Sequence, residues 1–231
     1  MSELNRRVGI HVHGRHLQAV EAEAIMWGRP PHQLGQLTLA LRILAEYQPG
    51  EVVSFSIGTG ASKKDGLLEA EYWGKMVAYR LSSLKDFAAF RSVDLDDLAV
   101  RVATTLFLEK TSQNTVQEAQ KLAELGSLLD FTDLVVVSAP THLSRIVVDV
   151  LKVLDSDPGF TKMRENVQFR ASDVPYAGCT VGDVVVVEPP HRGDDTSPPL
   201  YKLIPRYFRI PADKKHSFYD RFDQLLKEFG S

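Results

Sequence analysis

Short apolar segments alternate along this chain with segments that have the apolar spacing of a helix, and this alternation constrains the fold more than any other feature. The segments expected to form strands are Val8–Val12, Val52–Ile57, Thr104–Leu108 and Leu134–Val137. The segments expected to form helices are Leu34–Tyr47, Leu67–Leu81, Thr115–Leu129 and Leu143–Leu154. This order predicts an α/β fold with a mainly parallel sheet, and right-handed crossovers make it doubly wound, with helices on both faces.

The rest of the chain is expected to fold onto the same sheet. A short helix is predicted over Asp94–Val102, with Asp94 as its N-cap. The elements predicted in residues 155–231 are strands at Val167–Arg170 and Val184–Val187, an exposed loop at Glu188–Pro199 and an amphipathic helix at Phe218–Phe229. We expect one domain, in which residues 1–154 form a core with a ligand crevice and residues 155–231 complete or cover the sheet.

The composition indicates a cytoplasmic protein with neither nucleic-acid nor membrane partners. The 231 residues include 27 basic and 30 acidic side chains, and the formal charge of −3 provides no basic field for a nucleic acid. No segment approaches the roughly 20 apolar residues of a membrane span, and the charged N-terminus does not resemble a signal peptide. The single cysteine, Cys179, cannot form an intrachain disulfide, which fits a reducing compartment. Composition leaves the oligomeric state open.

Polar or glycine-rich residues follow each of the predicted strands of the core. Ligands of open α/β sheets bind in the crevice outside the carboxyl ends of the strands, so we expect a polar small molecule to bind there. The residues expected to bind it are Ser56, Gly58, Thr59, Gly60, Glu69, Ser112, Asn114, Thr115 and Ser138. The residues expected to act in catalysis are Glu109, His142 and Arg145.

The loop after the second predicted strand runs from Ser56 to Ser62 and is rich in glycine and hydroxyl side chains. Glycine lets backbone N–H groups approach a ligand closely, and hydroxyl groups add donors. The loop is neither a Walker loop nor a dinucleotide fingerprint, so an ordinary strand-to-helix turn is the alternative. Glu69, near the start of the next helix, either faces the ligand or interacts favourably with the helix dipole.

The loop after the third predicted strand begins with Glu109. A carboxylate at a strand end can hold a ribose or an amine, or act as a base. Three residues of the loop, namely Ser112, Asn114 and Thr115, are of types that cap helices. One of them is expected to cap the helix that follows, which leaves the other polar residues for a ligand.

The loop after the fourth predicted strand offers an anion pocket. Thr141 is expected to cap the helix. His142 and Arg145 are three residues apart and share a helix face, beside N–H groups at the helix start that favour an anion. The alternative for Arg145 is a surface pair with Asp149, which stabilises little.

Histidines follow the first predicted strand, in the sequence His11-Val12-His13-Gly14-Arg15-His16. His11 and His13 share a face of an extended segment, as in the His-x-His opening of several metallohydrolases, and two neutral imidazoles so placed can bind zinc. No carboxylate or second histidine pair follows at a recognisable metal spacing. We therefore expect structural or ligand-contacting histidines here and no divalent metal.

Several motifs in residues 52–154 occur together and in order. They are Ser56 with Gly58 and Gly60, then Glu69-Ala70, Glu109-x-x-Ser112-x-Asn114-Thr115, and Val137-Ser138-Ala139-x-x-His142-x-x-Arg145. This combination resembles the YdcF/SanA/ElyC-like family. The resemblance implies a Rossmann-like fold, and it implies S-adenosylmethionine or another nucleotide as a ligand, because one member is associated with S-adenosylmethionine. Membrane-anchored members are associated with envelope integrity, and the family implies no shared reaction.

The chain differs from this family where the first strand ends, since His11-Val12-His13-Gly14 stands in place of a glycine-rich segment, and where Gln117-Glu118 replaces Glu-Asn. Four functions stay open. The first is binding of a nucleotide-like or anionic small molecule, with transfer of a group. The second is hydrolysis of a phosphorylated or carboxylated substrate by His142, Arg145 and Glu109. The third is metal-dependent catalysis with His11 and His13, and the fourth is non-catalytic regulation.

Overall fold

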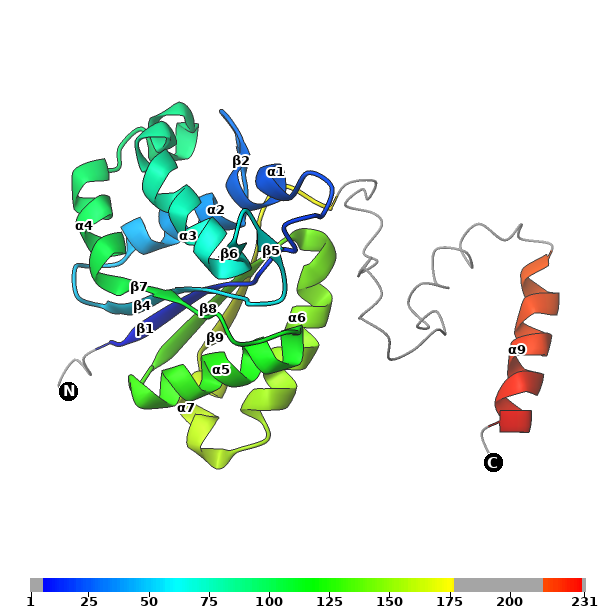
Figure 1. Ribbon diagram of the computed structural model, residues 1–231. Coiled ribbons are helices and arrows are strands. Elements are labelled where there is room, and N and C mark those ends of the chain that lie inside the picture. The colour runs from blue at the N-terminus through cyan, green and yellow to red at the C-terminus, as the bar shows by residue number, and fades with distance from the viewer. Residues whose placement is uncertain (1–5, 177–213, 230–231) are drawn as a thin grey trace.

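The computed structural model describes residues 6–176 and 214–229 and contains a central sheet of five parallel strands in the order β7-β4-β1-β8-β9 (Figure 1). The strands are β1 (Val8–Val12), β4 (Val52–Ile57), β7 (Leu106–Leu108), β8 (Asp133–Ser138) and β9 (Val167–Ala171). From the central β1 the chain runs to β4 and β7 on one side and then crosses to β8 and β9 on the other. The predicted parallel, doubly wound α/β fold is confirmed, and it is Rossmann-like.

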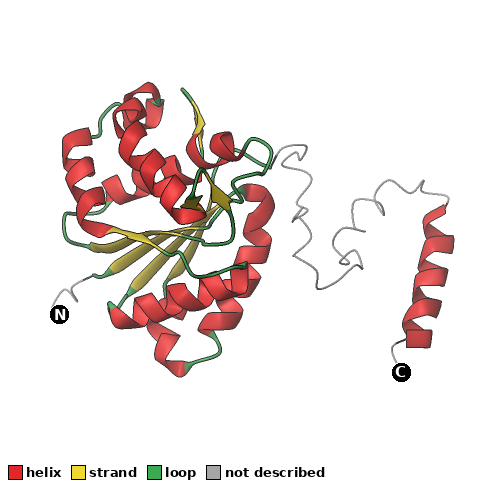
Figure 2. Ribbon diagram, in the orientation of Figure 1, coloured by secondary structure: helices red, strands yellow, loops and turns green. Residues whose placement is uncertain are grey.

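Helices cover both faces of the sheet (Figure 2). On one face lie α2 (Gln36–Glu46), α3 (Glu69–Arg80) and α4 (Leu95–Thr105), and on the other lie α5 (Thr115–Leu128), α6 (Pro140–Leu154) and α7 (Thr161–Glu165). Two hydrophobic clusters separate in the same way. Alternate residues of β8 supply both, since Val135 and Val137 pack in the first cluster and Leu134 and Val136 in the second.

The same alternation on β1 decides which of its side chains can reach the functional site. Val8, Ile10 and Val12 are fully buried in the cluster on the α2 side of the sheet. Gly9 lies on the α5 side, where an added Cβ would come 2.1 Å from the Phe131 ring. With a side-chain period of two, His11 also faces α5.

Most predicted elements are confirmed, and the differences lie at helix ends. Asp94 caps α4 as predicted, because its carboxylate accepts hydrogen bonds from the backbone N–H groups of Asp96 and Asp97. α4 continues to Thr105, so the strand predicted from Thr104 begins only at Leu106. The helix predicted from Leu143 begins at Pro140 instead, and the prediction of Thr141 as its N-cap is wrong. Proline suits the first position of a helix because its missing N–H has no partner there in any case.

Several short elements were not predicted. They are α1 (Ala22–Trp27), the hairpin of β2 (Gly28–Arg29) and β3 (Gln33–Leu34), the hairpin of β5 (Lys63–Lys64) and β6 (Leu67–Leu68), and the 3₁₀ turns η1 (Leu81–Asp86), η2 (Ala88–Phe90) and η3 (Pro158–Phe160). The predicted C-terminal helix is α9 (Lys215–Phe229). Cys179, the strand Val184–Val187 and the loop Glu188–Pro199 lie outside the described residues.

The segment that follows β9 crosses the carboxyl end of the sheet. The backbone N–H of Ser172 donates to the carbonyl oxygen of Ser138 at 2.9 Å, and that of Tyr176 donates to Thr141 Oγ1 at 3.1 Å. Val174 and Tyr176 are buried there against Ile25 of α1. The segment therefore covers part of the crevice in which the sequence places the ligand.

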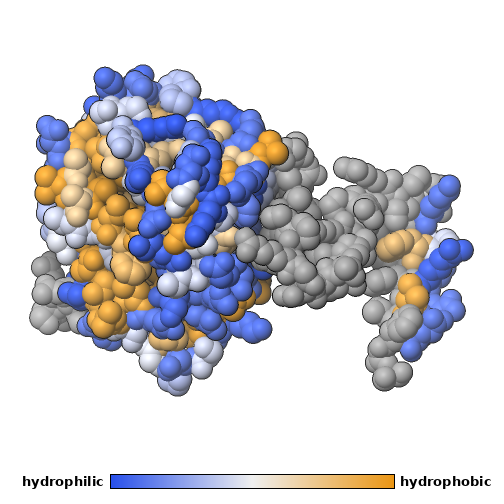
Figure 3. Space-filling view, in the orientation of Figure 1, coloured by the Kyte–Doolittle hydropathy of each residue, from blue (hydrophilic) through white to orange (hydrophobic). Residues whose placement is uncertain are grey.

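Apolar side chains gather on one side of the face shown in Figure 3, over α4 and the edge strand β7. Val100 of α4 is 63% exposed and Phe107 of β7 is 44% exposed. Within the described part of the chain, no helix combines the length and the apolar character needed to cross a membrane.

Candidate functional site

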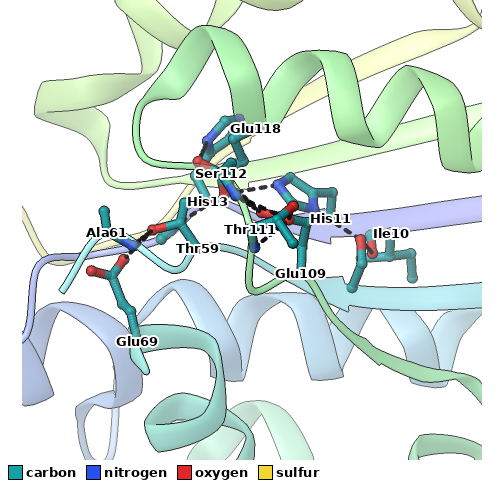
Figure 4. A network of polar contacts seen from close by, with 12 residues as sticks. Ile10, His11, His13, Thr59, Ala61, Glu69, Glu109, Thr111, Ser112 and Glu118 are labelled. Atoms are coloured by element: carbon teal, nitrogen blue, oxygen red, sulfur yellow. Dashed lines mark hydrogen bonds and ion pairs between the residues drawn. The ribbon is translucent and has the colours of Figure 1, made fainter. Parts of the chain in front are cut away.

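A buried carboxylate, Glu118, joins the two histidines that follow β1 (Figure 4). His11 Nε2 donates to Glu118 Oε1 at 3.0 Å, and His13 Nδ1 donates to Glu118 Oε2 at 2.8 Å. The backbone N–H of Gly14 adds a third donor, at 3.0 Å from Oε1. The three side chains are at most 3% exposed. Glu118 is thus the centre of a buried polar cluster at the carboxyl ends of the central strands.

The position of Glu118 follows from the start of α5. Asn114 is the N-cap of this helix, and its side-chain oxygen accepts from the backbone N–H of Gln117 at 3.0 Å. One of the three capping candidates in this loop is therefore identified as Asn114. The buried face of α5 includes Thr115, Glu118 and Leu122 at helical spacing. Glu118 thus lies one turn into the helix, on the side that faces β1.

Hydrogen bonds at both ring nitrogens hold the His11 side chain in one orientation. Ser56 Oγ on the neighbouring strand β4 lies 2.8 Å from His11 Nδ1, which accepts its hydroxyl proton while Nε2 carries the proton donated to Glu118. Burial lowers the pKa of His11, which supports this neutral tautomer. The pKa of Glu118 is held well below its usual range, because its electrostatic interactions and hydrogen bonds with His11 and His13 outweigh the effect of its burial. Glu118 is therefore an ionised carboxylate.

Two imidazole nitrogens near this cluster are buried and have no hydrogen-bond partner among the described residues, namely His13 Nε2 and His142 Nδ1. The ring of His142 stacks on that of Tyr176, with 5.8 Å between the ring centroids, and the Arg15 guanidinium lies 3.6 Å from the centroid of the same tyrosine ring. Burial, together with the nearby His13, Arg145 and Arg15, lowers the pKa of His142 to about 3, so that this imidazole is neutral at pH 7.

A second buried carboxyl group, Glu69, lies beside the cluster at the start of α3 (Figure 4). Its oxygens are bonded to Ser62 Oγ at 2.6 Å and to Thr59 Oγ1 at 3.2 Å. Gly14 passes so close that an added Cβ would lie 2.3 Å from Glu69 Oε1. Burial raises the pKa of Glu69 to about 8, with a smaller contribution from the Glu118 charge. At pH 7 Glu69 is therefore mostly uncharged.

The glycines of the loop after β4 are explained by close approach within the protein. A Cβ added to Gly58 would lie 2.0 Å from Glu118 Oε1, and one added to Gly60 would lie 2.0 Å from the carbonyl oxygen of Lys110. The loop thus makes room for the Glu118 carboxylate and for the neighbouring loop. This packing accounts for both glycines without a ligand.

The side chain of Glu109 is hydrogen-bonded within the loop that follows it. Its carboxylate accepts from the backbone N–H and hydroxyl of Thr111 at 2.7 and 2.5 Å, and from the backbone N–H and the hydroxyl of Ser112. These bonds hold the pKa of Glu109 below its usual range, although burial acts in the opposite direction. The contacts give Glu109 and Ser112 a structural role in the loop that leads to α5.

The remaining predicted residues lie around the cluster. Arg145 Nε donates to Asp149 Oδ2 at 3.2 Å, which is the pair expected as the alternative to an anion clamp. Ser138 is fully buried, and its Oγ has no partner among the described residues. His16 is half-buried, next to Leu17. The structure thus brings together His11, His13, Ser56, Gly58, Thr59 and Glu69 around Glu118, with His142 nearby.

Sequence reasoning missed Glu118, Arg15 and Tyr176. Metal-binding sequence motifs place a carboxylate at a short, fixed spacing from the histidines, whereas Glu118 lies 105 residues beyond His13. One signal was present, because Glu118 is an acidic residue on the otherwise apolar, buried face of a helix. A buried carboxylate in such a place needs polar partners.

Comparison of the chain with protein-family models, curated proteins and solved structures gave no match. The resemblance to the YdcF/SanA/ElyC-like family therefore stays a prediction. The function has to be inferred from the site itself.

Proposed function

We propose that this protein binds a small anionic molecule, with a phosphate or carboxylate group, in the polar cluster at the carboxyl ends of β1 and β8. The observation that carries the proposal is the pair of buried ring nitrogens without a described partner, His13 Nε2 and His142 Nδ1. Leaving a buried polar atom unpaired costs about 1–3 kcal/mol, and nearly all such atoms in folded proteins are paired. Two of them, on histidines close enough that His13 lowers the pKa of His142, favour a ligand that supplies the missing partners.

Among the charges around these nitrogens, the Arg15 guanidinium favours an anion, and the ionised Glu118 carboxylate, which is bonded to His13, opposes one. The Arg15 guanidinium, stacked on Tyr176, affects the pKa values of His142, Glu69 and Tyr176, so its positive charge acts on this part of the site. Arg15 Nε is buried and has no partner among the described residues. Glu69 is mostly uncharged at pH 7 and does not repel an anion, because its pKa is about 8. Arginine donors suit the planar oxygens of phosphate and carboxylate groups.

The reaction classes that we propose to test on this anion are hydrolysis and transfer of a group. Arg15 takes the anion-binding role first assigned to Arg145, which is paired with Asp149. His142 contacts the ligand as a neutral imidazole, because a group with a pKa of about 3 is a poor general acid at pH 7. Nucleotide-like ligands, including S-adenosylmethionine with its carboxylate, belong to the class that we propose to test.

The test is thermal unfolding with a panel of anions: inorganic phosphate, nucleoside monophosphates, S-adenosylmethionine and small carboxylic acids. A ligand at about 100 times its Kd stabilises the folded state by about 2.7 kcal/mol, which raises the Tm of a chain this size by roughly 5–10 °C. Arg15→Gln should abolish this rise. Arg42→Gln, which removes a surface pair with Glu46 on α2, is the matched control and should keep it.

Two results would refute the proposal. One is a panel in which no anion raises the Tm of the unaltered protein. The other is an equal rise in the unaltered protein and in Arg15→Gln, which would place the anion elsewhere on the surface.

A further inference from the structure

The side chains of His11, His13 and Glu118 have the chemistry and spacing of a metal-binding group. One ligand atom from each lies within 4.8 Å of the others. Two imidazole nitrogens and a carboxylate oxygen form a His₂Glu set, which binds zinc and other divalent transition metals. Metal–ligand distances of about 2.1 Å in a tetrahedral site separate two ligand atoms by about 3.4 Å. The nitrogen–oxygen distances here are 3.0 and 2.8 Å, so a small outward movement of the side chains accommodates an ion.

The charge of the cluster also favours a cation. Glu118 is buried and ionised, and its hydrogen-bond partners among the described residues are two imidazoles and the backbone N–H of Gly14. None of these partners carries a permanent positive charge. A buried carboxylate is costly unless it is paired with an opposite charge or coordinates a metal. A divalent ion supplies that charge. When it binds, the ring proton of His11 is carried on Nδ1, which then donates to Ser56 Oγ, and that of His13 is carried on Nε2, so that His11 Nε2 and His13 Nδ1 are free to coordinate the ion.

Neighbouring groups orient the side chains of His11 and Glu118 in the way that hydrogen-bond partners orient the ligands of known metal sites. The Ser56 hydroxyl fixes His11 through Nδ1 and leaves Nε2 toward Glu118. The Gly14 N–H fixes the carboxylate, and Gly58 leaves room for it. Partners of this kind orient metal ligands, and their loss typically weakens metal binding 10–100-fold.

We propose that His11, His13 and Glu118 bind one divalent transition-metal ion, for which zinc is the test case. A site with three protein ligands keeps a position for water or for an anionic oxygen of a substrate. The ion would supply Lewis-acid chemistry and a water of lowered pKa, which suits hydrolysis of a phosphate or carboxylate ester. The role of the ion in that chemistry rests on the proposed function, whereas the ion site itself rests on its three ligands.

The test uses full-length protein purified without a histidine tag and stripped with a chelator. Zinc alone is titrated and followed by calorimetry, with no anionic substrate present, and cobalt(II) is used to record a ligand-field spectrum. We expect one ion per chain with a micromolar or tighter Kd, and a cobalt spectrum typical of mixed nitrogen and oxygen ligands. Glu118→Gln and His11→Asn should each weaken zinc binding at least 100-fold.

Two further variants keep the test decisive if a ligand variant fails to fold. Ser56→Ala removes only the hydroxyl that orients His11 and should weaken zinc binding 10–100-fold. His32→Asn alters an exposed histidine outside the ligand set and should bind zinc like the unaltered protein. Absence of stoichiometric zinc binding would overturn the proposal, as would equal binding in Ser56→Ala, Glu118→Gln and the unaltered protein.

The metal-site proposal and the anion-binding proposal can be refuted independently of each other. Anions are titrated a second time with a chelator present, which removes any ion. Anion binding without zinc binding would reject the metal site and keep the anion site. Zinc binding without any anion binding would support the metal site and reject the proposed function.

Discussion

The raised pKa of Glu69 can be tested by measuring how the free energy of unfolding depends on pH. It is 2% exposed, and its oxygens are bonded to Ser62 and Thr59. Burial raises its pKa from 4.5 to about 8. Glu69→Gln keeps the shape of the side chain and removes its ability to ionise. The variant should therefore lose one specific dependence of stability on pH.

The sign and size of this dependence follow from the two pKa values. Between pH 4.5 and about pH 8 the folded protein keeps a proton on Glu69 that the unfolded chain has released. This contribution to the free energy of unfolding is fully present below pH 4.5 and is lost as the pH rises to about 8. At about 1.4 kcal/mol for each pH unit, the raised pKa corresponds to a ceiling of about 5 kcal/mol.

The assay is urea unfolding of the unaltered protein and of Glu69→Gln at pH 5 and at pH 8.5. The free energy of unfolding of the variant, relative to the unaltered protein, should rise by several kcal/mol between the two pH values. Glu124→Gln, which removes an exposed carboxylate paired with Lys121, is the control and should show almost no such change. Parallel pH profiles for Glu69→Gln and the unaltered protein would refute the reasoning.

Three other predictions concern stability and are measured by urea unfolding. Gly58→Ala places a Cβ 2.0 Å from Glu118 Oε1 and should destabilise the fold by about 1–3 kcal/mol, and an unchanged midpoint would contradict the close packing of this loop. Asp94→Ala removes the N-cap of α4 and should cost about 1 kcal/mol, whereas Asp94→Asn should cost less. Trp73 is fully buried and donates to the carbonyl oxygen of Arg15, so Trp73→Ala should cost about 3–5 kcal/mol and also weaken anion binding.

Much of the fold could be predicted because its strands are short, apolar and β-branched. Val8–Val12 and Val52–Ile57 have the predicted bounds, and α4 begins after the predicted cap. The two hairpins that flank α1 and α3 have strands of only two residues, too short for any periodicity to show. Tertiary contacts hold such elements, as the bonds between Leu34 and Asp173 do.

The candidate site could be predicted only in outline. The rule that ligands bind at the carboxyl ends of the strands led to the right loops, and it singled out His11 and His13. It led to Glu109 as the important carboxylate because that residue ends a strand. Glu118 instead reaches the histidines because the buried face of α5 packs against β1. The sequence spacing between Glu118 and the histidines does not reveal which face of α5 packs there. Arg15 and Tyr176 meet only because the segment after β9 folds back over the sheet.

Nuclear magnetic resonance of ¹⁵N-labelled histidine side chains tests the central claim most directly, because it observes the two ring nitrogens that have no hydrogen-bond partner in the described part of the chain. Inorganic phosphate, the simplest anion of the proposed class, is titrated into the protein. The account predicts saturable shifts of the His13 and His142 signals, with the exposed His32 as an internal control that does not respond. Signals of His13 and His142 that stay in place, or that move only as much as that of His32, would contradict it.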